Sequence, residues 1–217
     1  MWGETPMSDP SVDRPAERRV PYFSQWESAA LAPALIAGVA RLEDDPLWAA
    51  SGAQSVAEYA AWANRVCGMA CLKMILAARS GRILPTIKLA RGALRYGAYA
   101  SPDAPIQGLI YAPFVTFVAR EFGLHAEVVT GIEAAGLPAQ FERAEFFIAS
   151  VHPSIRFPRN LSSGRGGHLV LVTAAHAGGV TFHNPSGHGR SSRVDVRLPV
   201  PVFDAFFAGR GIAILPA

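Results

Sequence analysis

The chain has 217 residues, half of them hydrophobic and 17% charged, with a mean hydropathy of +0.21. This length fits one domain, and so much apolar material excludes an intrinsically disordered protein, which needs low hydrophobicity and high charge. The net charge of +3 is scattered, with no stripe of Lys and Arg interleaved with aromatic residues, so nothing favours a nucleic-acid partner.

The chain opens on a polar segment, Met1–Arg19, that is rich in Pro, Asp, Glu and Arg. This segment lacks the apolar core of a signal peptide, and the longest apolar stretches, such as Ala29–Ala40, are too short to cross a bilayer. We therefore expect a flexible N-terminal segment, 1–19, on a soluble cytoplasmic protein that does not insert into membranes.

Helical patterns follow a short, extended and aromatic segment at Val20–Gln25. The clearest helix begins at Cys67, because apolar side chains recur there at helical spacing until Ser80-Gly81 ends the pattern. Another is predicted to begin at Ser55, with Glu58 placed as in a capping box. The predicted helices are Ala29–Leu42, Ser55–Asn64, Cys67–Arg79, Thr86–Tyr96 and Pro113–Phe122.

Beyond Gly123 the patterns change to short runs rich in Val, Leu and Phe, which are typical of strands. The predicted strands are His125–Thr130, Phe146–His152, His168–Ala174, Val180–Asn184 and Gly211–Leu215, with short helices at Ile132–Phe141 and Pro201–Phe207. Helices first and a mostly antiparallel sheet afterwards predict an α+β fold, with the N-terminal helices packed on the sheet.

The two cysteines, Cys67 and Cys71, lie four residues apart on the predicted helix. Their Cβ atoms would be roughly 6 Å apart, which is too far for a relaxed disulfide. No second ligand pair completes a zinc site, the histidines lack metal-ligand spacing, and the sequence has no phosphate-binding glycine motif. We therefore expect no metal and no cofactor.

A thiol nucleophile needs a lowered pKa, a base within reach, and donors for the oxyanion. Cys67 is predicted at the first turn of its helix, where free N–H groups favour a thiolate. Gly68 beside it would allow close approach of a substrate backbone. Taken alone, a cysteine in an apolar helix is more often a core residue, and this is what we expect of Cys71 one turn deeper.

His168 and Asn184 provide the candidate base and its partner. His168 opens a strand directly after two glycines, and Asn184 ends the following strand. In an antiparallel hairpin these two positions lie at the same end, so the Asn184 amide is placed to accept a hydrogen bond from the imidazole. The alternative interpretation is a surface or core histidine and a simple turn asparagine.

Several segments occur in the order found in the C39-like group of papain-fold cysteine peptidases, which this sequence resembles over most of 20–215. The matching segments are VPYFSQ, CGMACLKMIL, GGHLVLVTA, FHNPSG and the closing aromatic helix with GIAIL. The resemblance implies a papain-like fold with Cys67 as nucleophile and His168 as base. It also implies that Asn184 orients His168 and that Gln25 supplies an oxyanion donor.

The spacing between Gln25 and Cys67 departs from that family, in which the gap is usually much shorter. We therefore interpret 20–217 as the peptidase domain and about 27–64 as a helical insert. Gln54 and Asn64 are alternatives to Gln25 as oxyanion donor. The aromatic side chains of this region either wall a substrate groove or pack a helical pair.

The resemblance implies a thiol-dependent peptidase that acts on a peptide or small protein, with processing of a precursor peptide as one option. An acyl or amide transferase on the same triad is an alternative, since the sequence does not decide whether water or an amine resolves the thioester. A peptide-binding module that kept the fold without catalysis is the other alternative, because fold alone does not establish activity.

Overall fold

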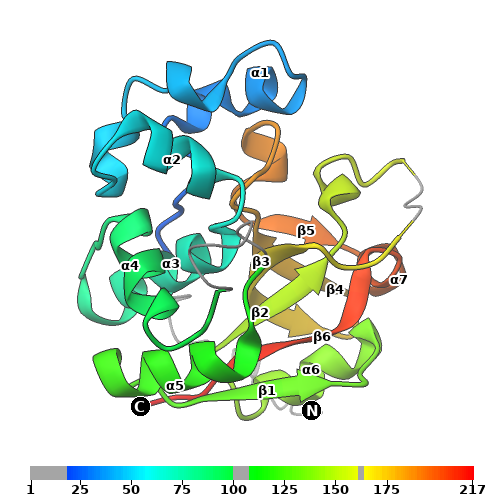
Figure 1. Cartoon of the computed structure of the whole chain (residues 1–217). Helices are drawn as coiled ribbons and strands as arrows, with labels where there is room; N and C mark the ends of the chain where they lie inside the picture. The colour runs from blue at the N-terminus through cyan, green and yellow to red at the C-terminus, as the bar shows by residue number, and fades with distance from the viewer. Residues whose placement is uncertain (1–18, 100–107, 161–163) are drawn as a thin grey trace, which may run out of the picture.

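The computed structural model describes residues 19–99, 108–160 and 164–217 (Figure 1). Its first half is helical. The helices are α1 (Ala32–Ile36), α2 (Val56–Ala63), α3 (Cys67–Ser80), α4 (Thr86–Leu94) and α5 (Tyr111–Phe122), with 3-10 turns η1 (Ala29–Leu31), η2 (Leu42–Asp44) and η3 (Trp48–Ser51). The predicted order of helices followed by a sheet is confirmed.

The second half forms a six-stranded sheet in the order β1-β6-β2-β3-β4-β5, in which every neighbouring pair is antiparallel. Its strands are β1 (Ala126–Thr130), β2 (Phe146–Val151), β3 (His168–His176), β4 (Gly179–His183), β5 (Val196–Leu198) and β6 (Phe207–Ile214). Between them lie η4 (Ala134–Gly136), α6 (Leu137–Phe141), η5 (Pro153–Arg156), η6 (Arg190–Ser192) and α7 (Val200–Asp204). The predicted hairpin of β3 and β4 is confirmed.

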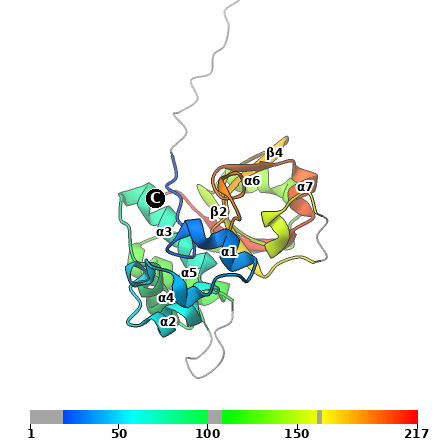
Figure 2. The ribbon, with the colours of Figure 1, turned by 90° about the horizontal axis from the view of Figure 1, so that it is seen from above.

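Both faces of the sheet are covered, and an apolar core lies on each. Along β2, Phe146 and Ile148 face the core shared with α3, α4 and α5, whereas Phe147, Ala149 and Val151 face the core shared with α6 and α7. This alternation follows from the two-residue repeat of a strand. Seen from above, the helical half and the sheet lie beside one another, with α1 where the two halves meet (Figure 2).

Two helical predictions of the N-terminal half had different outcomes. Ser55 caps α2, because its Oγ accepts a hydrogen bond from Glu58 N at 3.1 Å. The predicted helix over Ala29–Leu42 is wrong: it divides into η1 and α1, and the chain turns at Gly38, whose φ of 70° is left-handed.

Two further expectations concern segments at the edges of the described residues. The expected flexible segment 1–19 lies outside them except for Arg19. Within the described ranges, α3 is the longest helix at 14 residues, and no helix combines the length and apolarity needed to cross a membrane.

Candidate active site

Cys67 is the first residue of α3, as the sequence predicted. Its helix start packs closely on β3, since a Cβ added at Gly68 would lie 2.7 Å from Leu109 Cδ2 and 3.0 Å from Leu169 Cδ1. Gly68 therefore lets the helix approach Leu109 and β3, and the expectation that it leaves room for a substrate backbone stays a prediction. The helix start is held against the strand that begins with His168.

The two cysteines differ in exposure. Cys67 is partly exposed, whereas Cys71 is fully buried and its Sγ lies 4.0 Å from the carbonyl oxygen of Leu169. Burial raises the pKa of both thiols. For Cys67, the backbone N–H groups of Leu169, Gly68 and Cys67 itself and the charge of Arg156 oppose this rise in pKa, without reversing it.

His168 and Asn184 are brought together as predicted. His168 Nε2 lies 2.9 Å from Asn184 Oδ1, and His168 is only 4% exposed. Ser186 N donates to the same Oδ1 at 3.1 Å, which fixes the amide with its oxygen toward the ring. We therefore assign the imidazole proton to Nε2, where it is donated to Asn184. Nδ1 is left as the basic nitrogen, without a hydrogen-bond partner among the described residues.

The glycines before His168 explain how the chain enters β3 there. Gly166 and Gly167 have φ values of 83° and 92°, which residues with a Cβ rarely adopt. The two glycines thus provide the backbone conformation that lets the chain turn into β3 at His168, and residues 161–163 lie outside the described residues.

Cys67 contacts the chain next to the candidate base, at Leu169, which is the residue after His168. The Leu169 N–H interacts with the Cys67 sulfur, which places that sulfur at the start of β3. Within the described ranges, however, no hydrogen bond joins Cys67 Sγ to His168. The pKa of His168 is lowered to about 3, first by burial and then by the charge of Arg156, while the bond to Asn184 works in the opposite direction. At neutral pH both the thiol and the imidazole are therefore uncharged.

Two residues that sequence reasoning did not single out complete the site. Ser186 is fully buried, and its Oγ lies 2.9 Å from His168 Nε2. Arg156, at the end of η5, donates to Ser186 Oγ through Nε at 3.0 Å and Nη2 at 2.8 Å. No local pattern marks Arg156, whereas Ser186 is marked only by following Asn184-Pro185 in the turn.

Gln25 reaches the neighbourhood of the site despite its distance in sequence from Cys67. Its backbone N–H donates to Pro185 O at 2.9 Å, and its Nε2 donates to Ala63 O at 3.1 Å. The side chain is 3% exposed, and its Oε1 has no partner among the described residues. Gln25 thus lies between the turn after Asn184 and the chain leading into α3.

The segment around Gln25 is attached to the same turn by two further bonds. Tyr22 OH donates to Asn184 O at 3.1 Å, and Ser24 Oγ donates to Pro185 O at 3.0 Å. Both alternatives to Gln25, Asn64 and Gln54, are exposed. Asn64 Oδ1 accepts a hydrogen bond from Trp26 Nε1 at 3.0 Å.

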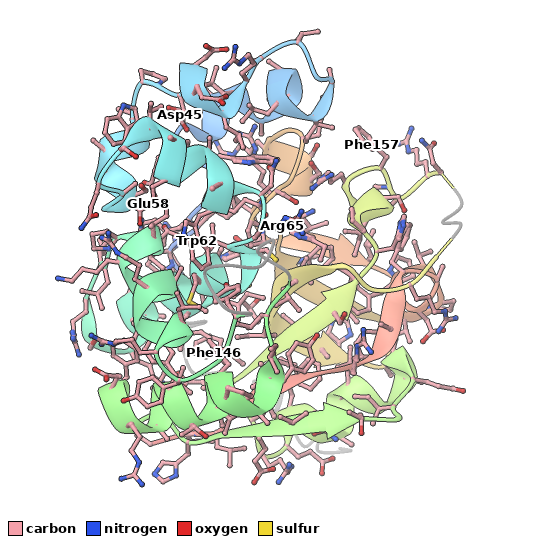
Figure 3. The ribbon with its side chains drawn as sticks, in the orientation of Figure 1. Asp45, Glu58, Trp62, Arg65, Phe146 and Phe157 are labelled. Carbon is pink, nitrogen blue, oxygen red and sulfur yellow. The ribbon has the colours of Figure 1, made fainter. Side chains whose placement is uncertain are left out.

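The aromatic residues of the expected insert pack a helical core. Tyr59 and Trp62 are buried, and Trp62 contacts Tyr99 edge to face at 5.1 Å between ring centroids. In Figure 3, Trp62 lies inside the helical half, and Arg65 lies where that half meets the sheet. The packing of Tyr59 and Trp62 therefore favours the interpretation of this region as a packed helical pair and not as the wall of a substrate groove.

Comparisons with known proteins give a partial likeness of fold. No protein-family model matches the chain, and no curated protein matches it. The peptidase domain of Streptococcus ComA, a bifunctional ABC transporter in a quorum-sensing pathway, is 18% identical, with 71% of this chain and 93% of that one covered and a TM-score of 0.49.

Two other solved structures are similar to a comparable degree. A double-glycine-motif protease from an AMS/PCAT transporter, in complex with its leader peptide, is 21% identical over 70% of this chain and 84% of that one, with a TM-score of 0.45. A Bacillus anthracis protein described as a C39-like peptidase is 13% identical over 70% and 90%, with a TM-score of 0.47.

Proposed function

We propose that the chain is a thiol-dependent peptidase that cleaves peptide bonds through an acyl-enzyme on Cys67. The observation that carries this proposal is the bond between His168 Nε2 and Asn184 Oδ1 at 2.9 Å, at the end of the sheet against which α3 begins. It orients a neutral imidazole with Nδ1 unprotonated, which is the form that a general base requires.

In the proposed reaction, Cys67 Sγ attacks the carbonyl carbon of the substrate while its proton passes to His168 Nδ1. Asn184 Oδ1 continues to accept the hydrogen bond from Nε2–H and stabilises the imidazolium that forms. The imidazolium then gives its proton to the leaving amine. Water attacks the thioester with His168 again as base, which releases the acid and restores the thiol.

Donors for the oxyanion are available at the start of α3, where the first helical N–H groups have no partner within the helix. Gln25 is the proposed side-chain donor. Its Nε2 uses one hydrogen on Ala63 O and keeps a second. An oxyanion donor of this kind contributes about 3 kcal/mol to transition-state stabilisation in serine peptidases.

The thiol and imidazole are neutral at rest, so the proton transfer from Cys67 to His168 must accompany substrate attack. Binding of a peptide over the partly exposed Cys67 brings the two side chains into contact in this proposal. We expect an extended peptide or an unfolded terminus as substrate, such as a precursor peptide, because Cys67 is accessible only in part.

A peptide library with a mass-spectrometric readout tests the proposal. We expect cleavage by the wild-type chain, at least about a thousandfold less by Cys67→Ala, and nearly unchanged cleavage by the matched Cys71→Ala variant. Melting temperatures of both variants control for folding. Cleavage that survives Cys67→Ala would exclude the mechanism.

The same experiment addresses the two alternatives. Addition of an amine acceptor to a trapped Cys67 thioester distinguishes acyl transfer, in which the amine is joined to the acyl group, from hydrolysis. Specific peptide binding without any acyl-enzyme at Cys67 would identify a non-catalytic binding module instead.

A further inference from the structure

Arg156 is a cation in the candidate site that has no acidic partner among the described residues. It is partly buried, and within the described residues it donates only to Ser186: to the carbonyl oxygen at 2.8 Å and to Oγ at 3.0 and 2.8 Å. Its guanidinium also lies over the Trp26 ring, 6.0 Å from the centroid. These contacts hold the side chain in one place without neutralising its charge.

Three other shielded cations of the described residues are paired with carboxylates. Lys73 lies 3.8 Å from Glu27, Arg79 lies 2.6 Å from Glu145, and Arg91 lies 3.2 Å from Glu58. A cation withdrawn from water without a counter-charge is costly. Arg193 is also partly buried without a carboxylate partner among the described residues, and it donates to the carbonyl oxygens of Gly187 and His188. Arg156 differs in that its unpaired charge lies next to the candidate nucleophile and base.

The position of Arg156 relative to the site is set by hydrogen bonds. Its Nη2 bonds to Ser186 Oγ, and the same Oγ lies 2.9 Å from His168 Nε2. The Arg156 charge also acts on the Cys67 thiol, whose pKa it lowers against the effect of burial. A ligand at this guanidinium would therefore lie beside the reacting atoms.

Nη1 of Arg156 makes no hydrogen bond to a described residue, and Nη2 uses one of its two hydrogens on Ser186. The unused donors of a guanidinium match the two oxygens of a carboxylate. Building on the function proposed above, we propose that Arg156 binds a substrate carboxylate close to the scissile carbonyl. Arg156 is then a specificity-determining residue that selects peptides with an acidic group beside the cleaved bond.

The charge selectivity of Cys67 alkylation tests the proposal without a known substrate. Iodoacetate carries a carboxylate and iodoacetamide does not. Both reagents react with the same thiolate, so the ratio of their alkylation rates at one pH does not depend on the ionised fraction of Cys67. We expect Arg156→Gln to lower the iodoacetate-to-iodoacetamide ratio at least about fivefold at low salt. Arg156→Lys should keep most of the ratio because it keeps the charge.

Arg159→Gln is the matched control, since Arg159 lies three residues further along the same segment and is exposed. It should leave the ratio unchanged. Equal ratios in wild type, Arg156→Gln and Arg159→Gln would overturn the proposal while leaving Cys67 as a reactive thiol. Failure of Cys67 to react with either reagent would instead overturn the peptidase function on which the proposal rests.

Paired peptides then identify the source of the carboxylate. Once a cleaved peptide is known, an internal Glu is compared with Gln, and a C-terminal acid is compared with its amide. A Km advantage of at least about fivefold for one acidic member that is lost in Arg156→Gln assigns that source. Equal cleavage of acidic and neutral members of both pairs would contradict the proposal.

Discussion

At Cys67, burial and local donors act in opposite directions on the thiol. Burial raises its pKa, and the N–H groups at the helix start and the Arg156 charge reduce that rise only in part. His168, with a pKa lowered to about 3, is neutral throughout the range in which the thiol ionises. The resting site is thus a neutral pair, and a preformed thiolate and imidazolium are not expected.

The pH dependence of Cys67 alkylation tests this protonation state. Because thiolate accumulates as pH rises toward a raised pKa, the iodoacetamide rate should climb with a single midpoint above about 8.5, the ordinary thiol value. His168 should add no step between about pH 5 and about pH 8, since its folded pKa lies below that range. The Cys71→Ala variant removes the second thiol as a background. A rate plateau at acidic pH would reveal an ion pair and contradict the prediction.

At this scale the sequence predicted the contact of His168 with Asn184, because hairpin geometry brings two strand ends together. It did not predict Arg156 or Ser186 as members of the site. Arg156 follows β2, Ser186 follows β4, and their contact depends on how the two loops pack, which no local pattern encodes. The catalytic roles of Cys67, His168, Asn184 and Gln25 stay predictions.

Among the elements, the segment between Gln25 and α3 is organised around a buried carboxylate. Asp45 accepts from Ser28 Oγ at 2.5 Å, Ser28 N at 3.1 Å, Tyr59 OH at 2.5 Å and Leu47 N at 2.9 Å. These bonds join the end of η2 to the chain before η1 and to α2. The interpretation of 27–64 as an insert stays a prediction. The hydrogen bonds of Asp45 connect parts of this segment to one another.

Asp45→Asn should lower the free energy of unfolding by about 2 to 3 kcal/mol at neutral pH, because an amide presents a donor where two oxygens accept. Burial acts to raise the pKa of Asp45, but the hydrogen bonds outweigh it and the pKa is lowered. Its contribution is therefore complete above the unfolded value of about 3.9 and is lost as pH falls toward the folded pKa. Urea unfolding at neutral and acidic pH measures both effects.

Asp44→Asn is the control for this variant, since Asp44 is exposed and bonds only to Arg41 N within the described residues. We expect it to change stability by less than about 0.5 kcal/mol. A gap between wild type and Asp45→Asn that stays constant from neutral to acidic pH would show that the carboxylate charge is not involved.

Element prediction succeeded where periodicity was strong and failed where it was not. The long apolar stripe of α3 and the apolar runs of β2 and β3 were sufficient to predict these elements from the sequence. The strand β5 was missed because it has only three residues and follows Asp195, whose φ of 47° is unusual for a non-glycine residue. Both misses, this strand and the broken helix over Ala29–Leu42, occur where one residue has a left-handed backbone.

At the scale of the whole molecule, one sheet contributes side chains to two apolar cores, one on each face. Strands β2, β3 and β6 place alternate side chains against the α3–α5 layer and against α6 and α7. The core of the helical half therefore includes side chains from the sheet, such as Ile148, Leu171 and Ile212. Sequence patterns predicted the N-terminal helices packed on the sheet, but the second layer of α6 and α7 and the strand order β1-β6-β2 followed only from the structure.

Gly211→Ala tests this shared dependence. A Cβ at Gly211 would lie 2.4 Å from Ile148 O and 2.4 Å from Phe147 Cε1, so β6 and β2 must move apart at this contact. We expect a loss of about 2 to 3 kcal/mol, as for an overpacked core. Three of the four tryptophans, Trp26, Trp48 and Trp62, lie in the helical half, and Trp2 lies outside the described residues. Tryptophan fluorescence and far-UV circular dichroism should shift to lower denaturant together.

Gly189→Ala is the matched control, because Gly189 has an extended φ of −138° and an added Cβ there meets nothing within 4 Å. It should leave both unfolding curves in place. If Gly211→Ala shifts the circular dichroism transition but leaves tryptophan fluorescence unchanged, the helical half unfolds independently of the sheet. The start of α3 and the start of β3 would then not be held together by one cooperative unit, and the placement of Cys67 beside His168 would need another cause.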